Sequence, residues 1–130
     1  VAKYNNGKNN TNVRFIESNL FENIQEQKFD IIVSNPPYIR SDVINKLSKQ
    51  VQNEPHLALD GGEDGLKFYK KIIEQSCNYI ENGYLILEIG YDQKEDVENL
   101  LKENKNYSEI KTIQDLSGND RCVIAKVGKI

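Results

Sequence analysis

The segment Phe29-Asp30-Ile31-Ile32-Val33-Ser34-Asn35-Pro36-Pro37-Tyr38 decides the fold of this chain, because it joins a strand pattern to a rigid turn. The mostly apolar, β-branched run at residues 29–34 predicts a strand that is buried on both faces, as in a parallel sheet. Each proline fixes its own φ, removes a backbone donor and holds the preceding residue extended. We therefore expect the strand to stop at a turn of fixed geometry.

The turn at residues 35–38 places hydrogen-bond acceptors at the carboxyl end of that strand, where open α/β sheets bind their ligands. The carbonyl groups of Asn35 and Pro36 cannot enter a continuing helix, and the Asn35 side chain adds a further oxygen. An NH2 group needs two acceptors, and a planar group needs a stacking partner such as the ring of Tyr38. The pattern favours a site for a planar amino or amide group. On these four residues alone, a simple loop is an equal alternative.

Composition and charge limit the class of protein. The 130 residues form at most one domain, and the 38% that are hydrophobic cluster in strand-like and helix-like runs, so a folded core is expected. No apolar run reaches membrane-spanning length and no signal-peptide pattern is present, which predicts a soluble cytoplasmic protein. The net charge is −3 with lysines scattered among acids, which favours a protein or small-molecule partner over nucleic acid.

Residues that could bind metals are sparse. His56 is the only histidine, which disfavours zinc sites and histidine-based nucleophilic catalysis. Cys77 and Cys122 are far apart, and we expect buried free thiols rather than a disulfide or a metal site. The glycine-rich segment at residues 60–65 lacks the acids that a calcium-binding loop needs. No metal site is therefore predicted.

Alternating or continuous apolar patterns predict strands besides the one at residues 29–34. They are residues 12–17, 84–89, 109–114 and 121–127. The loop between the last two strands is short enough for an antiparallel pair. Within these strands, Glu88 is either a partnered buried acid or an acid facing a cleft, and Arg121 is expected to form an ion pair with Asp120.

Helical patterns occupy much of the remaining chain, and residues 54–65 predict a loop. We expect the end of a helix within residues 1–10 and a helix at 43–51 capped by Ser41-Asp42. A third helix is expected at 66–80, ended by Asn82-Gly83. A fourth begins with a capping box of Asp92 and Glu95 and carries the apolar residues Val97, Leu100 and Leu101. This order of elements predicts an α/β fold with a mostly parallel sheet and an antiparallel C-terminal hairpin.

Three blocks and the turn carry a family resemblance. The turn at residues 35–38 resembles the Asn-Pro-Pro-Tyr signature of S-adenosylmethionine-dependent methyltransferases that modify planar nitrogens. The blocks at residues 54–66, 87–90 and 118–121 look like the HemK/PrmC family, whose members methylate the glutamine of a Gly-Gly-Gln loop in class-one peptide release factors. The resemblance runs from about Asn12 to Val127 and implies the Rossmann-like fold of these methyltransferases, with S-adenosylmethionine as cofactor and a release factor as partner.

The resemblance also assigns roles to residues. It implies that Asn35, Pro36, Pro37 and Tyr38 bind the substrate glutamine as catalytic residues, and that Asn35 also touches the cofactor. It aligns Asn19 and Leu20 with contacts on the adenine side of the cofactor. An acid commonly stands at the position of Asn19, and a larger aromatic residue can stand at that of Leu20. The alternative for Leu20 and Phe21 is that they are simply core residues.

The same resemblance implies parts that this sequence does not contain. The family has two earlier strands, which carry a glycine-rich cofactor turn and a ribose-binding acid, and a separate N-terminal helical domain. Gly61-Gly62-Glu63-Asp64-Gly65 cannot replace that turn, because it follows no strand and its glycines are wrongly spaced. We therefore expect residues 1–130 to form part of a catalytic domain, inactive alone, with an exposed sheet edge that favours self-association.

Two other functions stay open at this point. An amino-methyltransferase acting on adenine, cytosine or guanine in DNA or RNA also needs acceptors and an aromatic ring around a planar NH2 group. A catalytically inactive fragment is the third interpretation. The acidic balance and the blocks at residues 58–62 and 118–121 favour the release-factor methyltransferase.

Overall fold

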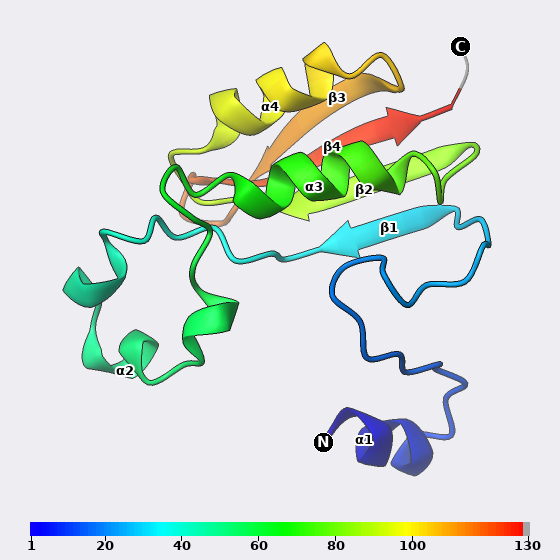
Figure 1. Cartoon of the computed structure of the whole chain (residues 1–130), viewed down its shortest axis with the longest axis horizontal. Coiled ribbons are helices and arrows are strands. Elements are labelled where there is room, and N and C mark those ends of the chain that lie inside the picture. Colours follow the sequence, from blue (N-terminus) through cyan, green and yellow to red (C-terminus); the bar gives the residue numbers. More distant parts are fainter. Residues whose placement is uncertain (129–130) are drawn as a thin grey trace.

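The computed structural model describes residues 1–128, which build a four-stranded sheet in the order β1-β2-β4-β3 (Figure 1). The strands are β1 (Ile31–Ser34), β2 (Gly83–Glu88), β3 (Tyr107–Gln114) and β4 (Asp120–Val127). β1 and β2 run parallel, whereas β4 is antiparallel to both of its neighbours. The α/β class and the C-terminal hairpin are confirmed, although only one of these three strand pairings is parallel.

Two helices cover one face of the sheet and enclose the core. They are α3 (Lys67–Ser76) and α4 (Lys94–Glu103), and their apolar faces meet β2 and β4. Tyr69 of α3 is fully buried and its hydroxyl donates to the Glu88 carbonyl at 2.7 Å. The Tyr107 hydroxyl likewise donates to the Ile73 carbonyl at 2.6 Å. These bonds fix α3 against the carboxyl end of β2 and the start of β3.

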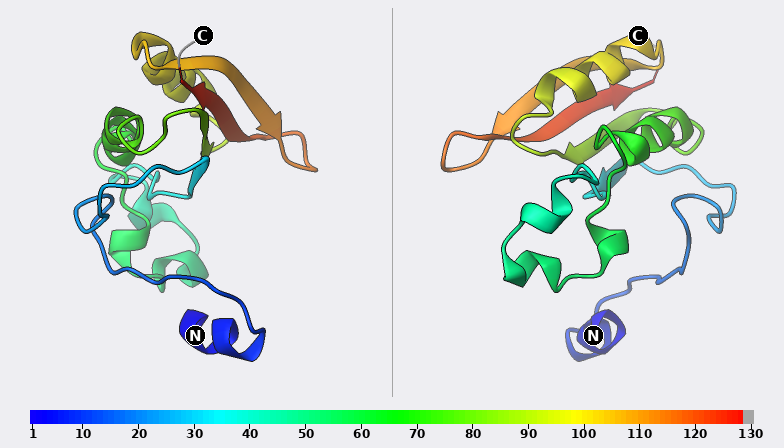
Figure 2. Two further views of the ribbon diagram at one scale, coloured as in Figure 1. Left: turned by 90° about the vertical axis from the view of Figure 1, so that its right-hand side faces the viewer. Right: turned by 60° about the vertical axis from the view of Figure 1, so that its left-hand side comes forward.

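The opposite face of the sheet carries no helix in the described part of the chain, as Figure 2 shows with both helices on one side. Ile31 and Val33 of β1 are 55% and 70% exposed, and Tyr84 of β2 is 40% exposed. The prediction that the β1 strand is buried on both faces is therefore wrong. Side-chain exposure alternates along β1, because only the inner side of this strand meets α3. β1 also forms an edge of the sheet.

The N-terminal residues lie away from the sheet. Helix α1 (Ala2–Lys8) ends in an asparagine-rich turn, as expected, and buries no residue. The strand predicted at residues 12–17 is wrong: Val13 and Ile16 are 54% and 41% exposed, and the segment has no strand partner within residues 1–128. Alternation alone does not make a strand, because a strand exists only through hydrogen bonds to a neighbour.

The helix predicted at residues 43–51 is split into two short pieces. These are the 3-10 turn η1 (Ile44–Lys46) and α2 (Lys49–Gln52), separated by an extended Leu47 with ψ 165°. Ser41 does not cap either piece, because its hydroxyl donates to the Asp60 carboxylate at 2.7 Å. The expected loop at residues 54–65 is confirmed and contains a further 3-10 turn, η2 (His56–Ala58).

Two helix boundaries differ from the predictions. α3 ends at Ser76, and Gly83 instead begins β2, where a Cβ would overlap the carbonyl oxygen of Asp30. α4 begins after Gln93 with no side-chain capping bond, so the capping box of Asp92 and Glu95 is not formed. Among residues 1–128, no helix has the length and apolar character needed to cross a membrane.

Candidate functional site

The Asn-Pro-Pro-Tyr turn leaves β1 at the carboxyl end of the parallel pair, where Ser34 lies beside Leu87 of β2. Asn35 is exposed, Pro36 is buried and Pro37 is half-buried. No backbone amide within residues 1–128 donates to the carbonyl oxygen of any of these three residues. The turn therefore offers unused acceptors at the sheet edge where α/β proteins bind ligands.

A cavity of about 710 Å³ lies beside these acceptors, and we call it the Asn35 groove. Residues 17–20 and Asn23 form one wall, residues 34–37 form the other, and Leu57 and Phe68 complete the lining. The groove brings together five of the six residues that the sequence assigned to substrate and cofactor: Asn19, Leu20, Asn35, Pro36 and Pro37. These residues come from segments that are separated by β1, so the fold creates their proximity.

Asn19 and Leu20 differ in how they meet the groove. Asn19 is exposed, and its side-chain NH2 donates to Glu22 Oε1 at 2.8 Å, which leaves its oxygen to accept from a ligand. Leu20 packs against the core beside Phe21 and has a φ of 51°, in the left-handed region that a leucine rarely adopts. Such local strain gathers at functional sites. Leu20 is thus both a core residue and part of the groove wall.

Tyr38 does not line the Asn35 groove. It lines a second cavity of about 340 Å³, together with Gly90, Asp92 and Arg121. Burial raises the pKa of the Tyr38 hydroxyl, and the nearby carboxylate of Glu88 raises it further, while Arg121 opposes the shift. The phenol therefore stays protonated and neutral at physiological pH. Among residues 1–128, no residue lines both the Asn35 groove and this smaller Tyr38 cavity.

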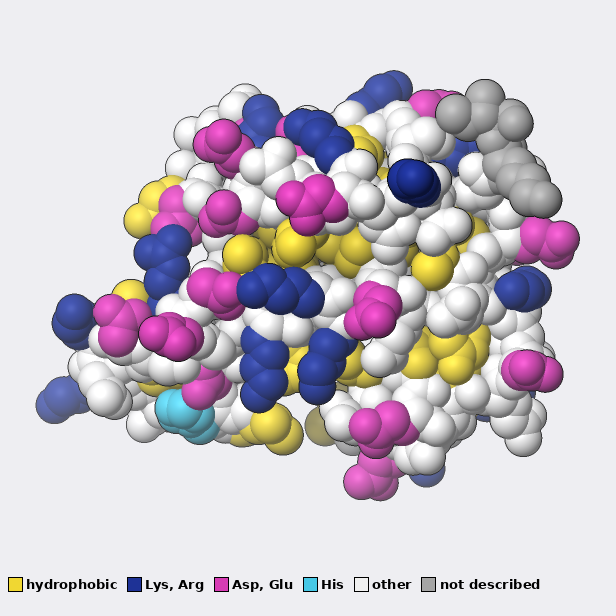
Figure 3. Space-filling view, turned by 45° about the horizontal axis from the view of Figure 1, so that its top comes forward, with side chains coloured by type: hydrophobic (Ala, Val, Ile, Leu, Met, Phe, Trp, Pro, Cys, Tyr) yellow, Lys and Arg dark blue, Asp and Glu magenta, His cyan; other side chains and the backbone are white. Residues whose placement is uncertain are grey.

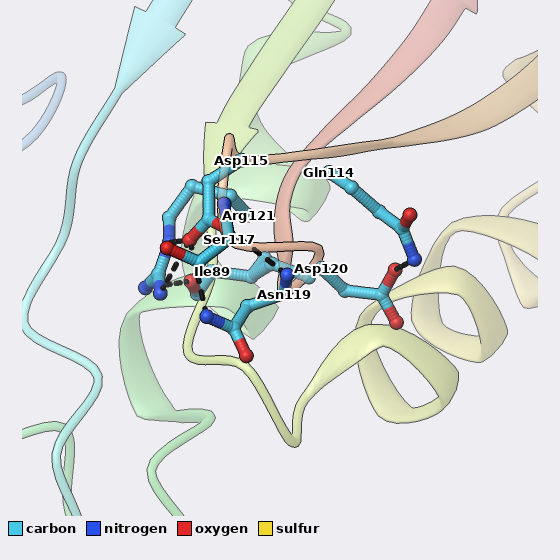
Figure 4. Close-up of polar contacts among 7 residues, drawn as sticks. All are labelled: Ile89, Gln114, Asp115, Ser117, Asn119, Asp120 and Arg121. Carbon is cyan, nitrogen blue, oxygen red and sulfur yellow. Dashed lines mark hydrogen bonds and ion pairs between the residues drawn. The ribbon is translucent and has the colours of Figure 1, made fainter.

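Arg121 is held by the hairpin that precedes it (Figure 4). Its guanidinium donates to Asp115 Oδ2 at 3.2 and 3.3 Å and to the Ile89 carbonyl at 3.3 Å. The predicted ion pair with Asp120 is wrong, because successive strand residues point to opposite faces and Asp120 accepts from Gln114 instead. Arg121 thus links the β3–β4 turn to the end of β2.

The two aspartates of the glycine-rich loop, Asp60 and Asp64, bond to other groups of the protein. Asp60 accepts from the Ser41 hydroxyl and from the Gly62 amide, and the Ser41 bond is the main cause of its lowered pKa. Asp64 pairs with Lys70 and has a lowered pKa for that reason. The described residues hold no group of three His, Cys, Asp or Glu side chains that could bind a metal ion. Both cysteines are free and half-buried.

One residue of the site was missed by the sequence analysis. Gln93 is 2% exposed, and its side chain bonds to the backbone of Gly90, Tyr38 and Gly65. The sequence pattern around it indicates only the start of a helix. The signal available was a glutamine three residues after Gly90, at the carboxyl end of an apolar strand.

Comparison with known proteins adds the family. The model of the Eco57I restriction-modification methylase family matches residues 2–122. A release factor glutamine methyltransferase of Fusobacterium nucleatum is 48% identical over 118 residues, covering 88% of this chain and 33% of its own length. One of Geobacter sulfurreducens is 38% identical over 130 residues, covering 98% of this chain and 45% of its own. The chain thus spans less than half the length of these curated relatives.

A solved structure supports the fold independently. The chain resembles the crystal structure of a methyltransferase from Pyrococcus furiosus with a TM-score of 0.66 at 23% identity, covering 98% of this chain and 56% of the other. The chain thus has the Rossmann-like fold of S-adenosylmethionine-dependent methyltransferases. By its family model the chain belongs to the Eco57I restriction-modification methylase family. It is also similar to curated release factor glutamine methyltransferases.

Proposed function

We propose that this chain carries the substrate turn of an enzyme that transfers a methyl group from S-adenosylmethionine to a glutamine side chain. The acceptor is the glutamine of the Gly-Gly-Gln loop in a peptide release factor. The observation that supports this most is the set of unused carbonyl oxygens at residues 35–37, next to the exposed amide of Asn35. The names of the curated relatives point to the same substrate.

The acceptors address the main chemical difficulty of the reaction. An amide nitrogen is a poor nucleophile, because its lone pair is delocalised into the carbonyl group. Hydrogen bonds from the substrate NH2 to Asn35 and to the Pro36 carbonyl would orient the nitrogen and stabilise the positive charge that develops on it. Pro37 holds the turn rigid, and the neutral Tyr38 ring would pack on the substrate plane from the side of the Tyr38 cavity. No general base is required.

The Asn35 groove fits the cofactor in part. The free oxygen of Asn19 suits an adenine amino group, and Leu20 supplies an apolar wall for the ring. Asn35 borders the same groove and could contact both the cofactor and the substrate. When bound, S-adenosylmethionine would supply the electrophilic methyl group. We propose that residues 1–130 form part of a larger catalytic domain, in keeping with the share of the relatives that they span.

The surface favours a protein acceptor over a nucleic acid. On the face shown in Figure 3, lysine and arginine side chains are interspersed with acids. Ion pairs such as Lys70–Asp64 and Lys102–Glu98 also join the two charges on the surface. A nucleic-acid backbone is usually bound by a basic patch. A release factor works with the ribosome, so we place the reaction in the cytoplasm.

A chimaeric enzyme tests the proposal, because it joins this chain to the rest of a longer relative. The present sequence would replace the matching 118-residue segment of the Fusobacterium nucleatum relative. Radiolabelled S-adenosylmethionine would then be offered with a release factor, or with single-stranded and double-stranded oligonucleotides. We expect label in the release factor only. Label in the oligonucleotides alone would favour the amino-methyltransferase and overturn the proposal.

Two controls make the result specific. A release factor whose Gly-Gly-Gln glutamine is replaced by alanine should take up no label. The chimaera with Asn35→Ala should lose about 10²-fold or more of its kcat, because one acceptor aimed at the developing charge is removed. The matched change Asn45→Ala, at an exposed asparagine that lines neither the Asn35 groove nor the Tyr38 cavity, should leave the rate unchanged.

A further inference from the structure

Gln93 is a buried polar side chain on which three backbone segments of the site converge. Its Oε1 accepts from the Gly90 amide at 2.9 Å. Its Nε2 donates to the Tyr38 carbonyl at 3.1 Å and to the Gly65 carbonyl at 3.3 Å. Both protons of the NH2 group are thus used. The three partners belong to the turn after β2, the substrate turn and the glycine-rich loop.

The position of Gln93 is set by the core. Its backbone amide donates to the Gly90 carbonyl and its own carbonyl accepts from Val97, both at 3.0 Å, so it is built into the start of α4. Val97 and Leu101 of that helix are buried at 0% and 1% exposure. The side chain therefore extends from a rigid support toward Tyr38. Gln93 thus joins the start of α4 to the substrate turn by a hydrogen bond.

The contact leaves no spare room around Tyr38. A Cβ on Gly65 would lie 2.6 Å from the Tyr38 carbonyl oxygen and 2.8 Å from Gln93 Nε2. A Cβ on Gly61 would lie 2.8 Å from the Tyr38 backbone. Two glycines and one amide therefore enclose the same peptide group. Such close packing leaves the backbone of Tyr38 little room to shift.

We propose that Gln93 is a positioning residue for the substrate turn. It occupies the Tyr38 carbonyl, so that the carbonyls of residues 35–37 remain the acceptors available to a ligand, and it fixes the direction in which they point. The inference rests on the proposed function for its purpose. The physical part, that Gln93 orders residues 35–40, can be tested without any substrate.

The amide group of glutamine matches this role, because the site needs one acceptor and two donors on one planar group. In Gln93→Glu, a carboxylate oxygen would replace the NH2 group. It would face the carbonyl oxygens of Tyr38 and Gly65, which accept hydrogen bonds from Gln93 in the wild type. In Gln93→Met, the volume would be kept and all three bonds lost. Gln50→Glu, on the exposed face of α2, is the matched control.

Nuclear magnetic resonance on the 130-residue chain tests the ordering. In the wild type, we expect the side-chain NH2 protons of Gln93 to exchange with solvent at least about tenfold more slowly than those of Gln50. In both Gln93 variants, backbone order at residues 35–40 should fall, whereas backbone order in β4 should stay the same. In the Gln50→Glu control, backbone order at residues 35–40 should also stay the same. Equal exchange of the two side chains, or a folded Gln93 variant with unchanged order at 35–40, would overturn the inference.

Kinetics of the chimaera separate positioning from a general loss of stability. Gln93→Met should lower kcat by about 10–10²-fold at 25 °C, where the variant is folded, with KM for both substrates nearly unchanged. An unchanged kcat would contradict the role. If the chimaera that keeps Gln93 methylates no acceptor, the proposed function fails. The exchange of the Gln93 side-chain protons in the wild type still decides whether Gln93 orders the turn. It does so even if neither Gln93 variant folds.

Discussion

Single residues at the carboxyl end of β1 determine what this site can accept. Pro36 and Pro37 have no amide hydrogen and end the strand, and the carbonyls of residues 35–37 stay unused within the described chain. Gln93, by contrast, has every hydrogen-bonding atom of its side chain occupied. The site therefore combines free acceptors with a support that is fully bonded. This combination suits a planar NH2 donor.

Gly65 offers a direct test of how tightly Tyr38 is enclosed. Gly65 and Gly118 both have positive φ values, 74° and 84°, but only Gly65 has neighbours where a Cβ would stand. Gly118→Ala should cost about 1–2 kcal/mol through backbone strain alone. Gly65→Ala should cost about 3–5 kcal/mol, because the clash with Tyr38 is added. Denaturant unfolding of both variants measures the difference, and equal losses would show that the contact is loose.

At the scale of elements, the β3–β4 hairpin supports the site through Arg121 and Asp115. Hydrogen bonds from the Asn119 amide, then from the Arg121 guanidinium and the Ser117 amide, hold the pKa of Asp115 below its ordinary value. A carboxylate whose pKa is lowered by folding adds stability above its unfolded pKa, and that contribution is lost as the pH falls through the folded value. The ion pair therefore stabilises the hairpin at neutral pH and not in acid.

The Asp115→Asn variant makes this pH dependence measurable. Its thermal midpoint should lie below that of the wild type at pH 7, because the charged acceptor for Arg121 is lost. The gap should begin to close as the pH falls below about 4, the ordinary pKa of an aspartate, and should close further as the pH falls through the lowered pKa of the folded Asp115. Asp42→Asn, at an exposed position outside the hairpin, should show no such pH-dependent gap. A constant gap for Asp115→Asn from pH 7 to pH 3 would contradict the assignment.

Elements also show what the sequence could and could not predict. The strands β1, β2, β3 and β4 and the helices α3 and α4 follow their apolar patterns, because burial against one another enforces those patterns. The segment at residues 12–17 has the same alternation but no neighbour to pair with in the described chain. The groove residues were predicted by resemblance to a family. Gln93 was not predicted, because the hydrogen-bond partners that allow a polar residue to be buried can lie far away in the sequence.

At the scale of the whole molecule, within residues 1–128, the sheet has one face that no helix covers and an exposed edge strand. β1 lies at the edge, and Ile31 and Val33 are more than half exposed. Unpaired backbone groups beside exposed apolar side chains invite pairing with another chain. We propose that this 130-residue chain associates with itself through β1 when no other segment covers it.

Light scattering across a range of protein concentrations tests this association. The wild type should show dimers or larger species, and Val33→Lys should shift the average mass toward the monomer, because a lysine on an edge strand opposes pairing. Leu116→Lys is the matched control, since Leu116 is fully exposed at the hairpin turn and away from β1. A monodisperse wild-type monomer would count against the proposal.

The central claim is that the turn at residues 35–38 directs methylation of a glutamine side chain. Mass spectrometry of the release factor after reaction with the chimaera tests it most directly. We predict one added methyl group on the peptide that contains the Gly-Gly-Gln loop, located on the glutamine side-chain nitrogen and absent when Asn35→Ala is used. A methyl group elsewhere on the release factor, or one that persists with Asn35→Ala, would contradict the account.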